Sequence, residues 1–173
     1  MSIDLILCGA SGRLGSEIVK ELENDSSIKL AACVSSKNNP NIGKKISEFA
    51  DSSSDIKLQN SLKEVSKSDV MLDVSSPDFF EEILNFSKSN NVPLIIASTG
   101  HNEEQLNALQ KLSQSIAIMV APNLSMGINF IKKFFNSSSF DILTNDIEIH
   151  ETHHKDKIDS PSGTAIELKN LLE

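Results

Sequence analysis

The feature that most constrains the fold is a short apolar run followed at once by a glycine-rich loop. Residues 3–8 are almost wholly apolar and end at Gly9, and such a run beside a glycine favours a buried strand over a helix. Residues 13–23 then place apolar side chains at helical spacing, and a second apolar run covers residues 30–34. This strand, glycine loop, helix and strand together predict a βαβ unit.

The same alternation continues through the first 122 residues. Apolar runs at residues 70–74, 93–97 and 116–121 predict further strands, and residues 78–89 and 103–113 carry helical patterns between them. The polar stretch 35–62 offers only a short strand at residues 56–58. Strands separated by helices imply a mostly parallel sheet with right-handed crossovers. We therefore predict an α/β fold in which residues 1–122 form a Rossmann-type, doubly wound parallel sheet that binds a dinucleotide.

The pattern changes after Pro122. Residues 126–135 predict a helix, and residues 146–152 alternate polar and apolar side chains with the period of a half-exposed strand. A loop then leads into a final helical pattern over residues 165–172. One strand and one helix cannot bury a sheet face without further partners. Residues 123–173 are therefore predicted to form an incomplete α+β domain.

Composition excludes several classes of protein. The net charge of −8 argues against nucleic acid and anionic membrane surfaces as partners, because both attract a basic surface. No run reaches the roughly 18 apolar residues of a membrane span, and the first residues lack the basic start of a secretory signal. Cys8 and Cys33 are the only cysteines, and each lies in an apolar run, which is typical of buried, reduced thiols. These features favour a cytoplasmic protein.

The position of the glycine loop, Gly9-Ala10-Ser11-Gly12-Arg13-Leu14-Gly15, favours dinucleotide binding. Between a strand and a helix, Gly9 would allow a tight turn, Gly12 would let the backbone approach a pyrophosphate, and Gly15 would let the helix pack closely on the strand. The spacing is G-x-x-G-x-x-G, one residue wider at the front than the usual fingerprint. The alternative is a plain tight turn without a ligand.

The end of the second strand bears on the choice of cofactor. Sites for NAD place an acidic residue there to bind the ribose 2′-hydroxyl, whereas this chain has Ser35, Ser36 and Lys37. Two hydroxyls and a lysine suit a 2′-phosphate, and the missing carboxylate removes the repulsion that would exclude it. NADPH is therefore the preferred cofactor, with NADH as the alternative. The competing interpretation treats the three as ordinary loop residues.

Three of the four histidines cluster within five residues. The segment His150-Glu151-Thr152-His153-His154 has the form of the zinc-protease pattern H-E-x-x-H, which requires both histidines on one face of a helix. In the strand predicted here, positions four apart lie roughly 13 Å from each other, so no metal site is predicted.

Residues 151–165 taken together favour an anion site instead. They combine His153, His154 and Lys157 with a Ser-Gly-Thr sequence at the start of a helix, where N–H groups bind carboxylates. A small polyanionic substrate fits this combination. The alternative is a solvated loop with an ordinary helix cap.

Five segments in the right order resemble the family of 4-hydroxy-tetrahydrodipicolinate reductase (dihydrodipicolinate reductase). Residues 151–165 are similar to its most specific signature, and the glycine loop resembles the family's loop down to Arg13, the only arginine of the chain. Residues 73–77, Asp-Val-Ser-Ser-Pro, resemble the family's Asp-Phe-Thr-x-Pro. Residues 97–100, Ala-Ser-Thr-Gly, stand where the family has Gly-Thr-Thr-Gly, and residues 121–129 match the interdomain segment nearly position for position.

The resemblance implies an NAD(P)H-dependent oxidoreductase of diaminopimelate and lysine biosynthesis that reduces 4-hydroxy-tetrahydrodipicolinate, a small dicarboxylate, to tetrahydrodipicolinate. It implies that His153 is the proton donor or acceptor and Lys157 the second catalytic residue. It also implies that His154, Gly163 and Thr164 bind the substrate carboxylates. Together with the two serines and the lysine after the second strand, the predicted cofactor-binding residues are Gly9, Ala10, Ser11, Gly12, Arg13, Leu14, Ser35, Ser36, Lys37, Ala97, Ser98, Thr99, Ala121, Pro122, Asn123 and Leu124. Of these, the resemblance implies that residues 97–99 and the backbone of residues 121–124 approach the nicotinamide.

Family members continue beyond the last helix with strands that complete a domain for substrate binding and tetramerisation. The resemblance therefore implies a C-terminally truncated member in which residues 123–173 form part of that domain, and a homotetramer for the full-length family. Two other interpretations stay open. One is a catalytically inactive dinucleotide-binding fragment of such an enzyme, and the other is a different Rossmann oxidoreductase, such as a semialdehyde or homoserine dehydrogenase.

Overall fold

The computed structural model describes residues 2–66, 68–136, 147–153, 155 and 160–172. The chain divides into two compact units, Met1–Pro122 and Asn123–Glu173, called unit 1 and unit 2 below. Within these described ranges, every helix is too short or too polar to cross a lipid bilayer.

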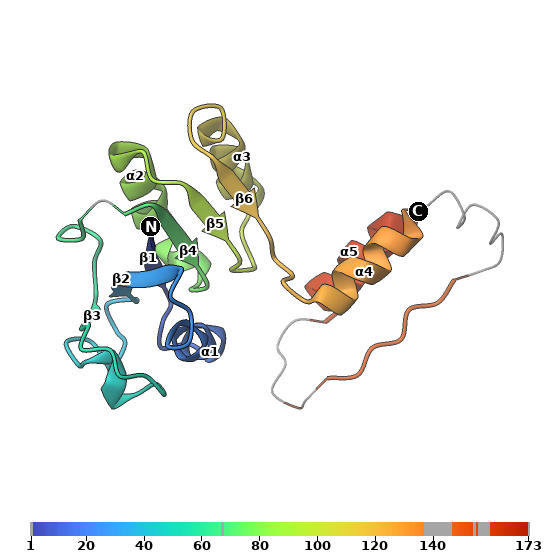
Figure 1. Ribbon diagram of the computed structural model, residues 1–173. Helices are drawn as coiled ribbons and strands as arrows, with labels where there is room; N and C mark the ends of the chain where they lie inside the picture. The colour runs from blue at the N-terminus through green and yellow to red at the C-terminus, as the bar shows by residue number, and fades with distance from the viewer. Residues whose placement is uncertain (1, 67, 137–146, 154, 156–159, 173) are drawn as a thin grey trace. The chain divides into compact units, whose positions relative to one another are not determined.

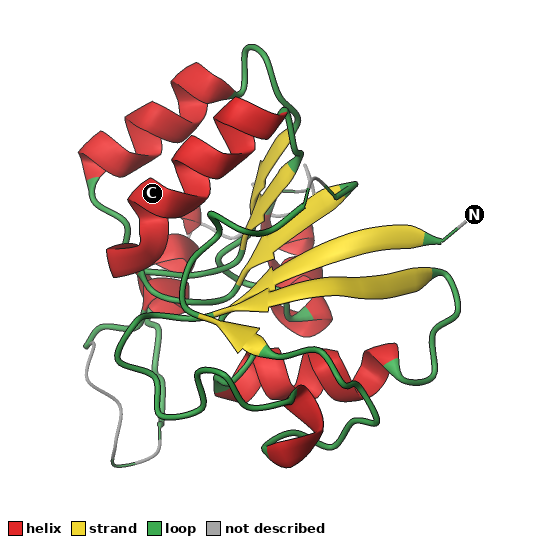
Figure 2. Ribbon diagram, turned by 90° about the vertical axis from the view of Figure 1, so that its left-hand side faces the viewer, coloured by secondary structure: helices red, strands yellow, loops and turns green. Residues whose placement is uncertain are grey.

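Unit 1 is built on one parallel sheet, to which its described residues contribute six strands, and Figure 2 shows this sheet as a twisted fan. The strand order is β3-β2-β1-β4-β5-β6 (Figure 1), so the direction of winding reverses between β1 and β4. The predicted α/β fold with a doubly wound parallel sheet is confirmed. The elements of this unit are β1 (Ile3–Cys8), α1 (Arg13–Leu22), β2 (Ile28–Val34), a 3-10 turn (Ile46–Glu48), β3 (Leu58–Gln59), β4 (Val70–Asp73), a second 3-10 turn (Pro77–Phe79), α2 (Phe80–Asn90), β5 (Leu94–Ile96), α3 (Glu103–Leu112) and β6 (Ile118–Val120).

Helices cover both faces of this sheet, because successive side chains of a strand point to opposite faces. Ile6 of β1 belongs to a buried apolar cluster with Phe80 of α2. Its neighbour Leu7 belongs to the cluster on the other face, with Val19 of α1. That second cluster includes the fully buried Ile46, which comes from the polar stretch where the sequence predicted little structure. Because the helices cover the two faces, the loops that follow the strands form the carboxyl edge of the sheet.

Helix boundaries follow local capping signals. α2 ends at Asn90 and is followed by the C-cap residue Asn91, whose φ of 52° gives the left-handed conformation typical of a helix C-terminus. α3 begins with a capping box, in which the Asn102 side chain accepts from the Gln105 N–H at 2.9 Å and the Gln105 side chain accepts from the Asn102 N–H at 3.0 Å. These caps place the ends of both helices within one or two residues of the predicted boundaries.

Both cysteines are buried and free, which confirms the prediction of reduced thiols. Burial raises the pKa of the Cys33 thiol to about 12. Burial, and to a lesser extent the nearby Asp73 carboxyl, also raises the pKa of Cys8. A protonated thiol is a poor nucleophile, so neither cysteine is a catalytic candidate.

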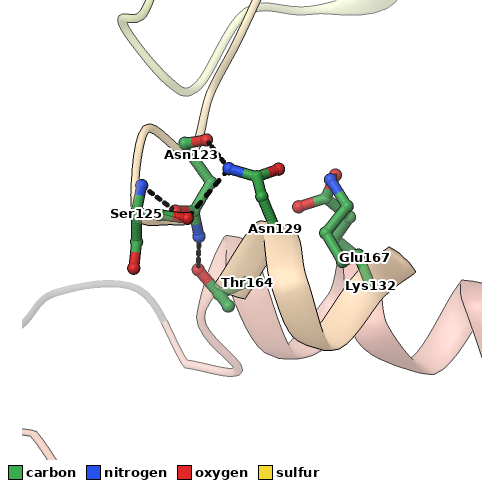
Figure 3. Close-up of polar contacts among 6 residues, drawn as sticks. All are labelled: Asn123, Ser125, Asn129, Lys132, Thr164 and Glu167. Atoms are coloured by element: carbon green, nitrogen blue, oxygen red, sulfur yellow. Dashed lines mark hydrogen bonds and ion pairs between the residues drawn. The ribbon is translucent and has the colours of Figure 1, made fainter. Parts of the chain in front are cut away.

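Unit 2 contains two helices that lie side by side, α4 (Met126–Phe135) and α5 (Gly163–Leu172). Asn123 joins their starting turns (Figure 3). Its side-chain nitrogen donates to the Thr164 hydroxyl at 2.9 Å, and its side-chain oxygen accepts from the N–H of Ser125, the cap of α4, at 3.0 Å. Further along, Lys132 and Glu167 form an ion pair between the helices. The predicted helix over residues 126–135 is confirmed, and the last helix begins two residues earlier than predicted.

The strand predicted over residues 146–152 is wrong for its described part. Residues 147–152 carry no strand pairing, and their apolar side chains Ile147 and Ile149 are 48% and 40% exposed. A strand requires hydrogen bonds to a neighbouring strand, and the described portion of unit 2 supplies none. Alternation of polar and apolar residues is therefore insufficient without a partner strand.

Candidate functional site

The glycine loop lies at the carboxyl end of β1, where the strand order reverses. Gly9 has a φ of +92°, a left-handed conformation that favours glycine. A Cβ on Gly9 would stand 2.8 Å from backbone atoms of Val74 and Ser75, which follow β4. The Gly9 carbonyl accepts from the Gly12 N–H at 3.0 Å, so the tight turn predicted here is confirmed. The loop thus lies in the crevice where doubly wound sheets bind their ligands.

The first turn of α1 presents N–H donors to this crevice. Gly12 is the N-cap residue, and no described side chain accepts from the N–H groups of the first turn. Such uncapped groups attract phosphate, and the missing side chain at Gly12 allows close approach. A Cβ on Gly15 would stand only 2.1 Å from the Gly9 carbonyl oxygen, so helix and loop pack too closely for any side chain there. The next two residues of the turn, Arg13 and Leu14, are exposed, and this cradle fits a pyrophosphate.

A pocket of about 240 Å³ lies between the glycine loop and the loop after β2. The predicted residues Ser11, Ser35 and Ser36 line it, whereas Lys37 does not and is exposed. Asn39 also lines the pocket, and its side chain donates to the hydroxyl oxygens of Ser11 at 2.6 Å and Ser35 at 3.0 Å. Asn39 was not predicted as a site residue, because it is one of many polar residues in a stretch without a motif.

A buried carboxylate anchors the loop after β5. Asp73 accepts hydrogen bonds from the Ser75 N–H at 2.9 Å and from the hydroxyls of Ser75 and Ser98. Its backbone carbonyl accepts from the N–H groups of Ala97 at 2.8 Å and Ser98 at 3.1 Å. Ala97, at the position of a family glycine, is buried, so its methyl group is packed inside the protein. Of the three residues predicted to approach the nicotinamide, only Thr99 is exposed.

His101 extends this network and was not predicted. Ser98 donates its one hydroxyl hydrogen to Asp73, so the Ser98 oxygen accepts from Nε2–H of His101 at 2.9 Å. The imidazole packs against Phe80, with ring centroids 5.3 Å apart. Its Nδ1 is buried and finds no hydrogen-bond partner among the residues that the structure describes. The ring therefore serves first to hold the Ser98 side chain in place.

The predicted segment 121–124 falls on both sides of the unit boundary. Ala121 is buried and its N–H donates to the Ile96 carbonyl at 2.7 Å, while Pro122 is exposed. Asn123 uses its side chain to join the helices of unit 2, and Leu124 is exposed. The side chain of Asn123 is thus structural, and the contact of this segment's backbone with nicotinamide stays a prediction.

In unit 2, Glu151 links His153 to the start of α5. Its carboxylate accepts from the Ser162 N–H at 2.8 Å, from the Ser162 hydroxyl, and from His153 Nε2 at 2.8 Å. Ser162 is buried and caps α5, because its oxygen also accepts from the Ala165 N–H at 3.0 Å. The hydrogen bonds from the Ser162 side chain, from His153 and from the Ser162 backbone lower the pKa of Glu151 to about 2. Glu151 is therefore ionised at neutral pH.

An ionised Glu151 fixes the tautomer of His153. A carboxylate only accepts hydrogen bonds, so Nε2 carries the hydrogen and Nδ1 is the ring atom that can gain or lose a proton. Gly163 and Thr164 form the first turn of α5, and no acceptor for their N–H groups lies in the described parts of the chain. These two N–H groups can bind a carboxylate.

Two predicted site residues, His154 and Lys157, lie outside the described residues. Where the structure does describe the chain, no three His, Cys, Asp or Glu side chains gather in a group suited to a metal ion. His150, the first histidine of the apparent zinc pattern, instead contacts Glu148 at 3.0 Å, and both side chains are exposed.

The cap of α5 should be acid-labile. The fold lowers the pKa of Glu151 from 4.5 to about 2, so its contribution to stability is complete above pH 4.5 and is lost as the pH falls toward 2. We expect the amide resonance of Ser162 to shift over this range in a nuclear magnetic resonance titration. Glu151→Gln should remove that titration. An unchanged Ser162 resonance down to pH 2 in the parent protein would contradict the contact.

The sheet, the glycine cradle at the reversal of strand order and the uncapped α1 define the class of protein, a Rossmann-type α/β protein whose cradle suits a dinucleotide. Within that class, the chain belongs to the dihydrodipicolinate reductase family. The family model for "Dihydrodipicolinate reductase, N-terminus" matches residues 3–124, and that for "Dihydrodipicolinate reductase, C-terminus" matches residues 127–173. The predicted resemblance is confirmed in both units. The curated relatives that match this chain carry the name 4-hydroxy-tetrahydrodipicolinate reductase.

Individual relatives agree with this assignment. The chain is 36% identical over 175 residues to the 4-hydroxy-tetrahydrodipicolinate reductase of Buchnera aphidicola subsp. Cinara cedri, covering 97% of this chain. It is 33% identical over 171 residues to that of Clostridium novyi, covering 98% of this chain. A dipicolinate-bound dihydrodipicolinate reductase from Paenisporosarcina sp. TG-14 superposes with a TM-score of 0.73 at 29% identity over 99% of this chain. The chain spans 63% of the length of the first two relatives and 66% of the solved one.

Proposed function

We propose that this protein catalyses the NAD(P)H-dependent reduction of 4-hydroxy-tetrahydrodipicolinate to tetrahydrodipicolinate, with NADPH as the preferred cofactor. The observation that carries the proposal is the cradle at the end of β1, where Gly9 and Gly15 leave no room for a side chain. The named reaction follows from the relatives, which align over 97% and 98% of this chain.

Residues of unit 1 would hold the dinucleotide. The loop from Gly9 to Leu14 would bind the pyrophosphate through the N–H groups of the first turn of α1. Ser35 and Ser36 lie where the ribose of the adenosine half would be placed, with Lys37 exposed next to them in sequence. The exposed Thr99 and the backbone of residues 121–124 are the proposed neighbours of the nicotinamide ring.

When bound, a reduced nicotinamide supplies a hydride to a conjugated carbon of the substrate. Converting the named substrate into the named product removes the 4-hydroxyl as water and adds one hydride and one proton. The developing charge needs that proton from a nearby acid. We assign this role to Nδ1 of His153, because Glu151 holds the opposite ring nitrogen as Nε2–H and orients the ring. Lys157 is the second catalytic residue that the family relation suggests.

The start of α5 is the proposed anchor for the substrate carboxylates. The Ser162 N–H already donates to Glu151, and the Ala165 N–H donates to the Ser162 hydroxyl oxygen. The N–H groups of Gly163 and Thr164 are therefore the donors left for a ligand. His154 would supply a further cationic partner. The Paenisporosarcina relative was solved with dipicolinate, itself a dicarboxylate, which supports a dicarboxylate ligand in this chain. By the same relation, the full-length protein is proposed to be a cytoplasmic homotetramer.

The first test is oxidation of NADPH, then of NADH, by the purified chain. The substrate is generated in the assay by the preceding synthase of the pathway, and cofactor binding is measured in parallel by calorimetry. Turnover that requires both the synthase and the chain supports the proposal. Tight binding of NADPH without turnover would support a dinucleotide-binding module instead, and a chain that binds neither cofactor would refute the assignment of unit 1.

A further inference from the structure

Asn39 joins the two loops that border the pocket beside the glycine loop. Its side-chain nitrogen donates to Ser11 Oγ at 2.6 Å and to Ser35 Oγ at 3.0 Å. Ser11 belongs to the loop after β1 and Ser35 to the loop after β2, and all three residues line the same pocket. One amide group thereby sets the orientation of two serine hydroxyls.

The orientation of this amide is fixed by a third contact. The other atom of the Asn39 amide accepts from the backbone N–H of Asn41 at 2.9 Å. A backbone N–H is only a donor, so the atom facing it is the oxygen. The atom facing Ser11 and Ser35 is therefore the NH₂ group, whose two hydrogens serve the two hydroxyl oxygens.

This arrangement turns both hydroxyls into donors toward the pocket. Each serine hydroxyl has one hydrogen, and an oxygen that accepts from Asn39 keeps that hydrogen for another partner. No protein acceptor for either hydrogen is present among the described residues. Ser35 is only 6% exposed, so its hydrogen is directed within a confined space. The ligand that best satisfies both donors is a group that only accepts hydrogen bonds.

Phosphate is such a group, and the wall of the pocket is compatible with its charge. The described residues that line the pocket are glycine, serine, asparagine, valine and phenylalanine, and none carries a carboxylate. We propose that Asn39 makes this pocket a phosphate subsite by orienting Ser11 and Ser35 as donors, and that it thereby selects the 2′-phosphate of NADPH over the 2′-hydroxyl of NADH. The inference rests on the proposed function, in that it assumes a dinucleotide bound along the glycine loop. Asn39 itself is a positioning residue.

The test is the affinity of the Asn39→Asp variant for NADPH and for NADH, measured separately by calorimetry without substrate. Aspartate at this position would accept from both hydroxyls, so their hydrogens would point away from the ligand, and it would add a negative charge. We expect affinity for NADPH to fall by about ten-fold or more, because hydrogen bonding to the charged phosphate is lost and the new carboxylate repels it. Affinity for NADH should change by less than about three-fold. Asn39→Ala removes the orientation without adding charge and should also weaken NADPH selectively.

Asn41→Asp is the matched control. It makes the same change of charge two residues away, at a side chain that contacts Lys44 Nζ at 3.1 Å and does not line the pocket. Unchanged NADPH affinity in this control with selective loss in both Asn39 variants supports the proposal. Equal loss of NADPH and NADH in the Asn39 variants would show that the oriented phosphate is the pyrophosphate, which overturns the assignment of the 2′-phosphate. Unchanged affinities in Asn39→Ala would overturn the orienting role. These affinities are measured without substrate, so they can be obtained even if the chain does not oxidise NADPH in the turnover assay. A failure of the proposed reaction can therefore be told apart from a failure of the proposed role of Asn39.

Discussion

Replacing Gly15 with alanine is expected to destabilise unit 1 and to weaken dinucleotide binding together. The added methyl group would stand 2.1 Å from the Gly9 carbonyl oxygen and 2.8 Å from Ala10 Cα. Both are backbone atoms, so no side-chain rotation relieves the overlap, and overpacking of this kind costs roughly 1–3 kcal/mol. For a unit of this size, the melting temperature should fall by roughly 5–10 °C. Because any relief must move the turn from Gly9 to Gly12, NADPH affinity should fall with it.

Gly127→Ala is the matched comparison for this variant. Gly127 also lies in the first turn of a helix, but a Cβ there would meet only Ser125 Oγ, at 3.7 Å, an ordinary contact. Alanine has a higher helix propensity than glycine by about 1 kcal/mol, so the melting temperature should stay constant or rise slightly. Since the chain contains no Trp or Tyr, unfolding is best followed by far-ultraviolet circular dichroism. Equal melting temperatures and NADPH affinities in Gly15→Ala and the parent protein would contradict the close packing.

The contrast between these glycines shows why much of unit 1 could be predicted from the sequence. The roles of Gly9 and Gly15 depend on backbone geometry within one strand, turn and helix, and that geometry is encoded by neighbouring residues. The strands and helices were likewise predicted from local periodicity. The two failures have a common cause. Ile46 is buried although its neighbours are polar, and residues 147–152 alternate without forming a strand. Ile46 is buried by residues far away in the sequence, and residues 147–152 have no partner strand in the described part of the chain. In each case, contacts distant in sequence decide the structure and the local pattern does not.

The side-chain networks could not be predicted for a related reason. Asn39 reaches Ser11 across 28 positions of sequence, and Asp73 reaches Ser98 across 25. Polar residues are common in both loops, and nothing in their spacing indicates which pair will meet. His153 was found through its family signature, but its partner Glu151 was not assigned a role. The contact of Glu151 with Ser162 at the α5 cap joins residues 11 positions apart, so it is seen only when both are placed in space.

Replacing His153 with glutamine is expected to reduce turnover by about 10²–10⁴-fold, the usual contribution of a general acid or base. Glutamine can still donate a hydrogen bond to Glu151, as His153 Nε2 does at 2.8 Å, but it cannot exchange a proton at neutral pH. The loss should therefore fall on kcat rather than on the dissociation constant of NADPH. The measurement is steady-state oxidation of NADPH by the protein, with calorimetric binding in parallel.

His150→Gln controls for the loss of an imidazole as such. His150 and His153 make the same local contact, since each bonds through Nε2 to the glutamate two residues before it, at 3.0 Å and 2.8 Å, although the His150 side chain is 85% exposed and that of His153 39%. They differ in what that glutamate does, because Glu151 also binds the cap of α5, whereas the Glu148 side chain is 82% exposed. Turnover close to the parent value in His150→Gln, beside a large loss in His153→Gln, would therefore tie proton transfer to the helix that we propose binds the substrate. A kcat for His153→Gln within ten-fold of the parent value would show that another group supplies the proton.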